Sequence, residues 1–162
     1  VKLVLAMRPD RIVVGEVRAA EAFELTRASN AGCGFACTIH ANSARDALNA
    51  LVNAALMAGE NVTEDIVRKV FASTIDFVIH LDRDASAREG QPMRRQTMEI
   101  LTLNPSLHDD FTTEPLFHRE GIGRPLEWTG QLPNEALRKR IDAALPDGMD
   151  VRAICDGTVT PL

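Results

Sequence analysis

The sequence lacks any hydrophobic run long enough to cross a membrane. None of its apolar stretches approaches the about 18 to 20 residues that a membrane-spanning helix requires, and no secretory signal peptide opens the chain. Of the 162 residues, 45% are hydrophobic and 25% are charged, which is the composition of an ordinary soluble globular protein. One substantial hydrophobic core is therefore expected.

Positive charge is not concentrated in any part of the chain. The formal net charge is −5, and the lysines and arginines are scattered rather than gathered into a stripe. Binding to the phosphate backbone of a nucleic acid requires a basic surface of that kind. We therefore predict no direct nucleic-acid binding.

Cysteine is scarce, with three residues at Cys33, Cys37 and Cys155. The number is odd, and the chain carries no secretory signal. This pattern favours reduced thiols in a cytoplasmic protein over a disulfide framework.

Residues 1–82 show the alternation of strands and helices that is typical of an α/β protein. The expected order is a strand (residues 11–16), a helix (19–30), a strand (36–40), a helix capped by Ser43, a helix that begins at Thr63, and a strand (75–81). This order predicts an α/β domain with a mainly parallel sheet.

Residues 83–162 are expected to form a small annex of short strands and a terminal helix. Residues 83–95 are charged and contain Gly90 and Pro92, which predicts an exposed loop or hairpin tip. The expected elements are strands at residues 98–103, 111–118 and 125–128 and a helix at residues 133–145.

Glu16 ends a short β-branched strand and is the first candidate site residue. Carboxyl ends of parallel strands form the edge at which open α/β folds bind ligands. Gly15 leaves room there for a phosphate or a neighbouring strand, and Glu16 can orient an attacking water or hold the water shell of a metal. If the strand continues, Arg18 points to the same face as Glu16. The alternative is an ordinary ion pair between Glu16 and Arg18.

His40 is the second candidate, because it lies between an expected strand and an expected helix start. An imidazole in that position can contact phosphate oxygens or a carboxylate. The alternative is a histidine whose ring is satisfied by the local backbone.

Two segments together carry a resemblance to a known family. MRPDRIVVGEVR at residues 7–18 and TIHANSARDAL at residues 38–48 resemble the Walker B box and the His box of the secretion-ATPase superfamily. This superfamily comprises the hexameric motors of type II and type IV secretion, type IV pili, conjugation and tight-adherence pili, and the chain is most similar to the tight-adherence branch. The resemblance covers roughly residues 1–82.

The resemblance implies the C-terminal portion of a RecA-like P-loop ATPase that uses ATP and Mg²⁺. Glu16 would activate or position the attacking water and hold Mg²⁺ only indirectly, through bound water. His40 would sense the γ-phosphate of the nucleotide, and Arg18 would stabilise charge or contact a neighbouring element. Gly15 and Thr38 would lie beside the nucleotide.

The resemblance also implies an assembly and a place of action. The protein would form a homohexameric ring at the cytoplasmic face of the inner membrane. The ring would dock onto an integral platform protein of a pilus, secretion or conjugation system, and ATP hydrolysis would drive its movement.

The sequence departs from the family at two points. The phosphate-binding loop, G-x-x-x-x-G-K-[ST], is missing, and no lysine in the chain follows a glycine. In the family this loop precedes the Walker B box, so we expect the chain to be part of a longer ATPase and to be inactive alone. The His box often contains Gly-His-x-Gly, but Ala31 and Gly32 stand in place of its Gly-His, whereas Gly34 matches its second glycine.

Three other functions remain as alternatives. Cys33, Cys37 and His40, with His80 as a nominal fourth ligand, have the residue types of a structural zinc site. A Cys-His hydrolase would use Cys37, His40 and Asp46. The third alternative is a non-hydrolysing assembly subunit that keeps the fold of the motor.

Overall fold

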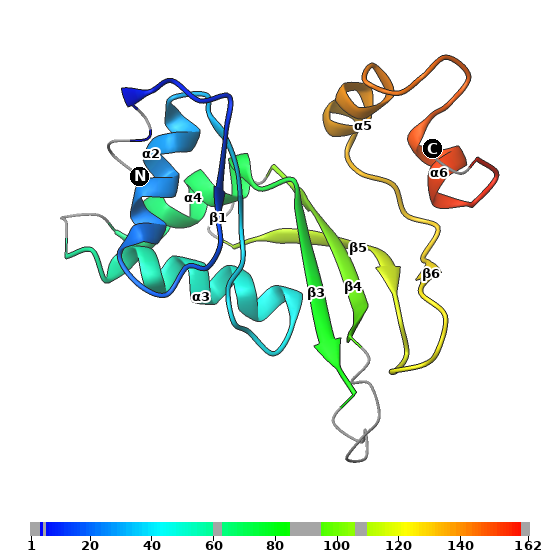
Figure 1. Cartoon of the computed structure of the whole chain (residues 1–162), viewed down its shortest axis with the longest axis horizontal. Helices are drawn as coiled ribbons and strands as arrows, with labels where there is room; N and C mark the ends of the chain where they lie inside the picture. Colours follow the sequence, from blue (N-terminus) through cyan, green and yellow to red (C-terminus); the bar gives the residue numbers. More distant parts are fainter. Residues whose placement is uncertain (1–3, 5, 60–62, 85–94, 106–109, 160–162) are drawn as a thin grey trace. The chain divides into compact units, whose positions relative to one another are not determined.

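The computed structural model describes residue 4 and residues 6–59, 63–84, 95–105 and 110–159 (Figure 1). Contacts divide the chain into two compact units, one comprising Val1–Ile75 with Pro105–Thr112 and the other comprising Asp76–Asn104 with Thr113–Leu162. The long N-terminal stretch of the first unit therefore ends at Ile75, whereas the predicted domain boundary is at residue 82. The division of function between an ATPase half and an annex stays a prediction.

A parallel pair of strands forms the centre of the first unit. Strand β1 (Arg11–Val14) pairs with strand β2 (Gly34–Cys37), and helix α2 (Glu21–Asn30) connects them (Figure 1). Ile12 is buried against Ala28 of α2, whereas Val13, which points to the opposite side of β1, is 81% exposed. One face of this pair is therefore covered by helix, and the other is open among the described residues.

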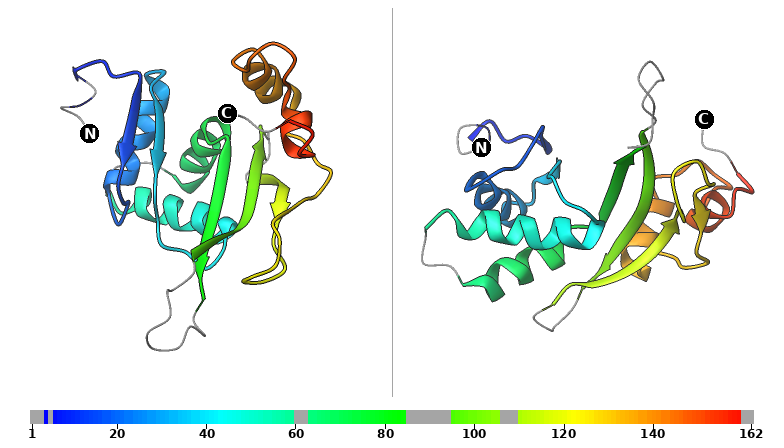
Figure 2. Two further views of the ribbon diagram at one scale, coloured as in Figure 1. Left: turned by 45° about the vertical axis from the view of Figure 1, so that its right-hand side comes forward. Right: turned by 90° about the horizontal axis from the view of Figure 1, so that it is seen from below.

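Two further helices complete the first unit. Helix α3 (Ala44–Leu56) and helix α4 (Glu64–Thr74) pack against α2 and against each other (Figure 2). Ser43 caps α3 as predicted, because its hydroxyl accepts the backbone N–H of Asp46 at 3.0 Å. The core that these helices share is apolar and fully buried, with Leu25, Leu48, Val52, Val67 and Phe71 among its largest side chains.

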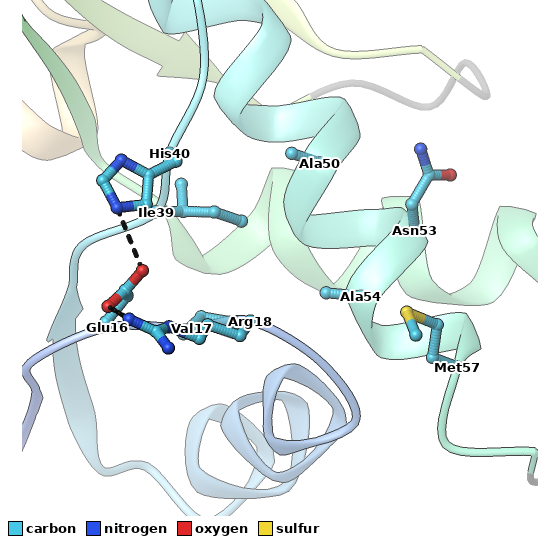
Figure 3. A pocket seen from close by; sticks show the side chains of 9 residues that line it. All are labelled: Glu16, Val17, Arg18, Ile39, His40, Ala50, Asn53, Ala54 and Met57. Carbon is cyan, nitrogen blue, oxygen red and sulfur yellow. Dashed lines mark hydrogen bonds and ion pairs between the residues drawn. The ribbon is translucent and has the colours of Figure 1, made fainter.

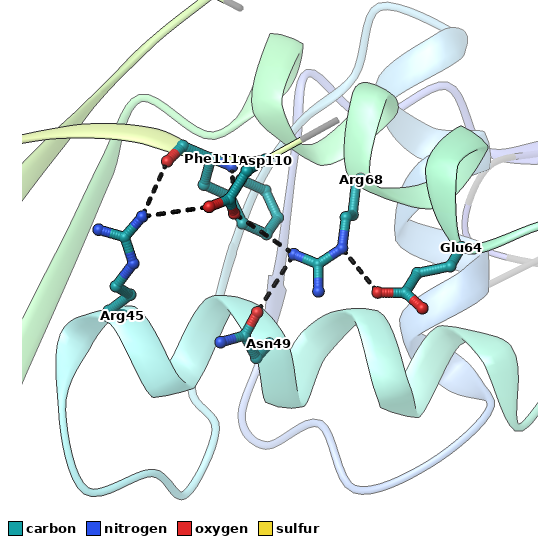
Figure 4. Close-up of polar contacts among 6 residues, drawn as sticks. All are labelled: Arg45, Asn49, Glu64, Arg68, Asp110 and Phe111. Carbon is teal, nitrogen blue, oxygen red and sulfur yellow. Dashed lines mark hydrogen bonds and ion pairs between the residues drawn. The ribbon is translucent and has the colours of Figure 1, made fainter. Parts of the chain in front are cut away.

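A charged cluster in the same unit joins α3 and α4 to the segment around Phe111 (Figure 4). Arg68 donates to Glu64 at 2.7 Å and to Asn49 at 3.2 Å, and its guanidinium lies 5.4 Å from the centroid of the Phe111 ring. Asp110 lies 3.8 Å from Arg68. Since the Phe111 ring is buried and the Arg68 side chain is only 19% exposed, these two side chains pack at the margin of the hydrophobic core.

The second unit contains a sheet with the strand order β3-β4-β5-β6 and two helices (Figure 2). The elements are β3 (Phe77–Arg83), β4 (Arg95–Asn104), β5 (Thr112–His118), β6 (Glu127–Trp128), α5 (Glu135–Asp142) and α6 (Val151–Cys155). The strands and the helix predicted for the annex are confirmed, whereas α6 was not predicted. The prediction for residues 83–95 lies largely outside the described residues.

The predicted α/β class is confirmed, but the prediction of a mainly parallel sheet is wrong. Only β1 and β2 pair in parallel among the described strands. Strand β3, which was expected to extend a parallel sheet, instead pairs antiparallel with β4, from Phe77 opposite Thr102 to Arg83 opposite Arg95. The next strand in the chain supplies this partner, and consecutive strands can pair antiparallel without a crossover helix. None of the described helices has the length and apolar character to cross a membrane.

Candidate functional site at the ends of β1 and β2

Backbone hydrogen bonds fix the turn that carries Glu16. The backbone N–H of Thr38 donates to the carbonyl of Val14 at 3.3 Å, and the N–H of Val17 donates to the carbonyl of Thr38 at 2.8 Å. The hydroxyl of Thr38 also donates to the carbonyl of Gly15. The turn after β1 is therefore tied to the segment after β2, and both carboxyl ends meet at one place.

The carboxylate of Glu16 contacts two cationic or potentially cationic side chains (Figure 3). Its Oε1 lies 3.1 Å from Nε2 of His40, and its Oε2 accepts a hydrogen bond from Nη2 of Arg18 at 2.7 Å. Each oxygen thus has its own partner. The two segments that resemble the Walker B box and the His box meet through these side chains.

Arg18 has the largest influence on the pKa of Glu16. The hydrogen bond and the positive charge of Arg18, together with the charge of His40 when it is protonated, hold the pKa of the Glu16 carboxyl below its ordinary value. The same hydrogen bond raises the pKa of Arg18. The exposed fraction is 27% for the Glu16 side chain, 77% for Arg18 and 92% for His40. Solvent therefore reaches this cluster, and both of the partners of Glu16 are free to contact a ligand.

A second carboxylate holds the loop that carries Arg18. Oε1 of Glu21 accepts the backbone N–H of Arg18 at 2.6 Å and that of Ala19 at 3.1 Å. These backbone donors hold the pKa of the Glu21 carboxyl below its ordinary value. The contact has the spacing of one half of a capping box, in which a glutamate accepts the N–H three residues before it.

A surface pocket of about 540 Å³ opens beside these residues (Figure 3). Glu16, Arg18 and His40 line one side of it, and α3 forms the facing wall. The lining side chains from α3 are Ala50, Asn53, Ala54 and Met57. The pocket thus combines a charged mouth with a largely apolar wall.

The structure brings together every site residue that the sequence indicated. Glu16, Arg18 and His40 line the pocket, and Gly15 and Thr38, which precede Glu16 and His40 in the two segments, are joined by a hydrogen bond. The expectation that Arg18 shares a strand face with Glu16 is wrong, because β1 ends at Val14 and Arg18 reaches Glu16 from a loop.

The sequence interpretation missed two parts of the site. One is the pocket wall from α3, for which the sequence carried no signal. The other is the contact of Glu21 with the loop, which the sequence did not signal because Arg18 is not a residue that caps helices.

The zinc and hydrolase alternatives do not fit this geometry. Across the described part of the chain, no three His, Cys, Asp or Glu side chains are grouped so that they could hold a metal ion, so Cys33, Cys37 and His40 do not form a zinc site. Burial raises the pKa of the Cys37 thiol, which opposes its use as a nucleophile. His40 is instead paired with Glu16.

The fold and the site together define an α/β protein with a pocket lined by charged side chains beyond the carboxyl ends of two parallel strands. Residues 1–114 match the family described as Type II/IV secretion system protein, and because this match covers most of the chain, the protein belongs to that family. The predicted membership of the secretion-ATPase superfamily is thereby confirmed.

Several relatives and a solved structure resemble the chain. It is 33% identical over 88 residues to the conjugal transfer protein TrbB of Rhizobium radiobacter, covering 54% of this chain and 26% of that protein. It is 36% identical over 89 residues to a putative conjugal transfer protein of Mycobacterium tuberculosis, covering 54% of this chain and 25% of that protein. The matched part therefore spans about a quarter of each relative.

The fold resembles that of the VirB11 ATPase from the Brucella suis type IV secretion system, whose crystal structure was solved in complex with sulphate. The TM-score is 0.52 at 24% identity, and the match covers 62% of this chain and 31% of that chain. At this identity the likeness concerns the fold alone.

Proposed function

We propose that the chain contributes the hydrolytic half of the ATP site in a motor ATPase of a secretion, pilus or conjugation system. The observation that carries the proposal is the 3.1 Å contact between Glu16 and His40 at the mouth of one pocket. The reaction is attack of water on the γ-phosphate of ATP. A subunit of this machinery that does not hydrolyse ATP is the competing possibility.

Glu16 is proposed to orient the attacking water. A glutamate carboxylate is ionised at neutral pH, and the lowered pKa of Glu16 favours this form further, so the carboxylate can accept a hydrogen bond from water. A carboxylate whose pKa is lowered is a weaker base than an ordinary glutamate, which favours orientation of the water over removal of its proton before attack. His40 and Arg18 are proposed to face the terminal phosphate, because both present N–H donors and both are exposed.

The donor set fits the end of a triphosphate. Arg18 and His40 can donate to phosphate oxygens, and the Glu16 carboxylate can accept from water within the shell of a magnesium ion. When bound with ATP, Mg²⁺ supplies positive charge that offsets the charge developing on the phosphate oxygens. The sulphate of the VirB11 complex is a tetrahedral anion like phosphate, which is consistent with anion binding in this fold. The sequence itself contains no phosphate-binding loop, so the 162-residue chain is expected to bind ATP weakly.

The wider assignments rest on family membership. A RecA-like core, a homohexameric ring and docking onto a platform protein at the cytoplasmic face of the inner membrane are proposals for the full-length protein. The relatives named for conjugal transfer favour conjugation or a related transport process as the setting.

The decisive variant is Glu16→Gln in the full-length natural protein. We expect kcat to fall by about 100-fold or more, because the neutral amide cannot hold the water as the carboxylate does, while ATP affinity changes little. Glu135→Gln is the matched control, since Glu135 is 70% exposed on α5 and pairs with Lys139 outside the pocket. Unchanged turnover in Glu16→Gln would refute the role of Glu16, and the absence of turnover in the wild-type protein would favour the non-hydrolysing subunit.

A further inference from the structure

We propose that Glu21 is a positioning residue that holds the backbone of Arg18 so that its guanidinium reaches Glu16 beside His40. The proposal deepens the proposed function and rests on it for its catalytic meaning. The structural observations that carry it are the two hydrogen bonds from Arg18 N–H and Ala19 N–H to one carboxylate oxygen of Glu21.

The loop between β1 and α2 is held on both sides of Arg18. On one side, Val17 is buried, being 2% exposed, and its N–H bonds to the carbonyl of Thr38. On the other side, Glu21 accepts the next two backbone donors. The backbone of Arg18 therefore has little freedom, although its side chain is 77% exposed.

No other side chain at the start of α2 takes over this task. Ala20, which occupies the N-cap position, has no side chain able to accept a hydrogen bond. Without Glu21, the N–H groups of Arg18 and Ala19 would be left to water, as exposed donors at helix starts commonly are. The loop would then sample other conformations, and a long, exposed arginine would lose its fixed approach to Glu16.

The contact that Glu21 would hold in place is the hydrogen bond from Arg18 to Glu16. Arg18 is the largest influence on Glu16, and the other charged groups facing this carboxylate are His40 and Glu21. The negative charge of Glu21 raises the pKa of Glu16, whereas Arg18 lowers it. Removal of Glu21 therefore changes the pKa of Glu16 in two opposite ways. Loss of its charge lowers this pKa, and loss of its hold on Arg18 raises it, so the sign of the net change tells which effect is larger.

The test is NMR of the 162-residue chain, following the side-chain carboxyl carbon of Glu16 through a pH titration in wild type and in Glu21→Ala. If Glu21 acts only through its charge, the pKa of Glu16 falls when Glu21 is removed. If Glu21 positions Arg18, the pKa of Glu16 rises, because the hydrogen bond from Arg18 is lost or weakened. The expected result is a rise, together with an upfield shift of the backbone N–H signals of Arg18 and Ala19.

Two further variants keep the test decisive. Glu21→Gln removes the charge but retains an oxygen of the same reach, so it separates the two effects: Arg18 should stay in place, and the pKa of Glu16 should fall or stay unchanged. Glu24→Gln is the control. The carboxylate of Glu24 lies on the same helix, but it pairs with Arg27 rather than with the loop. A fall or no change in the Glu16 pKa in Glu21→Ala would overturn the proposal.

Turnover in the full-length protein gives an independent readout. Glu21→Ala is expected to lower kcat by about 10- to 100-fold with little change in KM for ATP, because misplacement of a catalytic group affects turnover more than binding. The NMR test involves no nucleotide. A failed NMR test with active wild-type enzyme would therefore reject the role of Glu21 alone, whereas a positive NMR test with an enzyme insensitive to Glu16→Gln would reject the proposed hydrolytic site instead.

Discussion

Two charged clusters lie in the same unit of this protein and have opposite character. In the cluster around Glu16, the partners Arg18 and His40 are 77% and 92% exposed, and all three side chains line a pocket. In the cluster around Arg68, the guanidinium is 19% exposed and lies against the buried ring of Phe111 (Figure 4). The first cluster is built around a carboxylate with exposed donors, and the second around an arginine enclosed by acceptors.

The difference shows which ionic contacts stabilise a fold and which remain available for a ligand. Arg68 donates hydrogen bonds to Glu64 and Asn49, lies 3.8 Å from Asp110 and has an aromatic face beneath it, so its guanidinium is held by several partners. Exposed pairs such as Arg18 with Glu16 contribute little to stability, because water solvates the separated groups almost as well. We therefore expect changes in the Glu16 cluster to alter activity and changes in the Arg68 cluster to alter stability.

The largest effect after that of Glu16→Gln is expected for His40→Gln. The amide of Gln still offers an N–H donor, but it cannot carry the positive charge that a protonated imidazole places beside Glu16 and the proposed phosphate, so kcat of the full-length protein should fall by about 100-fold. Because the side chain is 92% exposed, the thermal midpoint of the chain should stay within error of wild type. His118→Gln, in the second unit, is the matched control, and equal losses in the two variants would contradict the account.

Substitution of Arg68 should produce the largest loss of stability. Arg68→Met keeps the aliphatic stem but removes the charged hydrogen bonds and the cation–π contact, so the free energy of unfolding should fall by about 2 kcal/mol. Lys139→Met is the control, since Lys139 is 73% exposed and pairs only with the exposed Glu135 in the described structure. Chemical denaturation measures both variants. A loss no larger than that of the control would show that the Arg68 cluster is not a structural one.

The smallest expected effect is a change of titration rather than of stability. The folded pKa of Glu16 is lowered, so its pair with Arg18 is fully formed above the ordinary carboxyl range and is lost as pH falls through the lowered value. In Arg18→Gln the titration of Glu16 should move upward, toward that of an ordinary glutamate. NMR of the Glu16 carboxyl carbon measures this shift, and an unchanged midpoint would mean that Arg18 does not contact Glu16 in solution.

The sequence was most informative where local chemistry decides the structure. A β-branched run followed by Gly15 and Glu16 marked a strand end, and Ser43 marked a helix start, and the structure has both features. The carboxyl ends of parallel neighbours lie at the same edge of a sheet, and the pairing of β1 with β2 in the structure accordingly brings Glu16 and His40 together.

Features that depend on pairing between distant segments could not be predicted in the same way. The apolar run that became β3 does not itself indicate whether its partner is parallel or antiparallel, and the partner turned out to be β4. The α3 wall of the pocket required the packing of a helix against a loop, for which Asn53 and Met57 carry no separate signal in the sequence.

A double-mutant cycle on Glu16 and His40, measured as kcat of the full-length protein, tests the central claim most directly. If the two groups act as one site, the variant that combines Glu16→Gln with His40→Gln should lose about as much activity as Glu16→Gln alone. Losses that multiply would show that the carboxylate and the imidazole act independently, and the shared hydrolytic site would then be wrong.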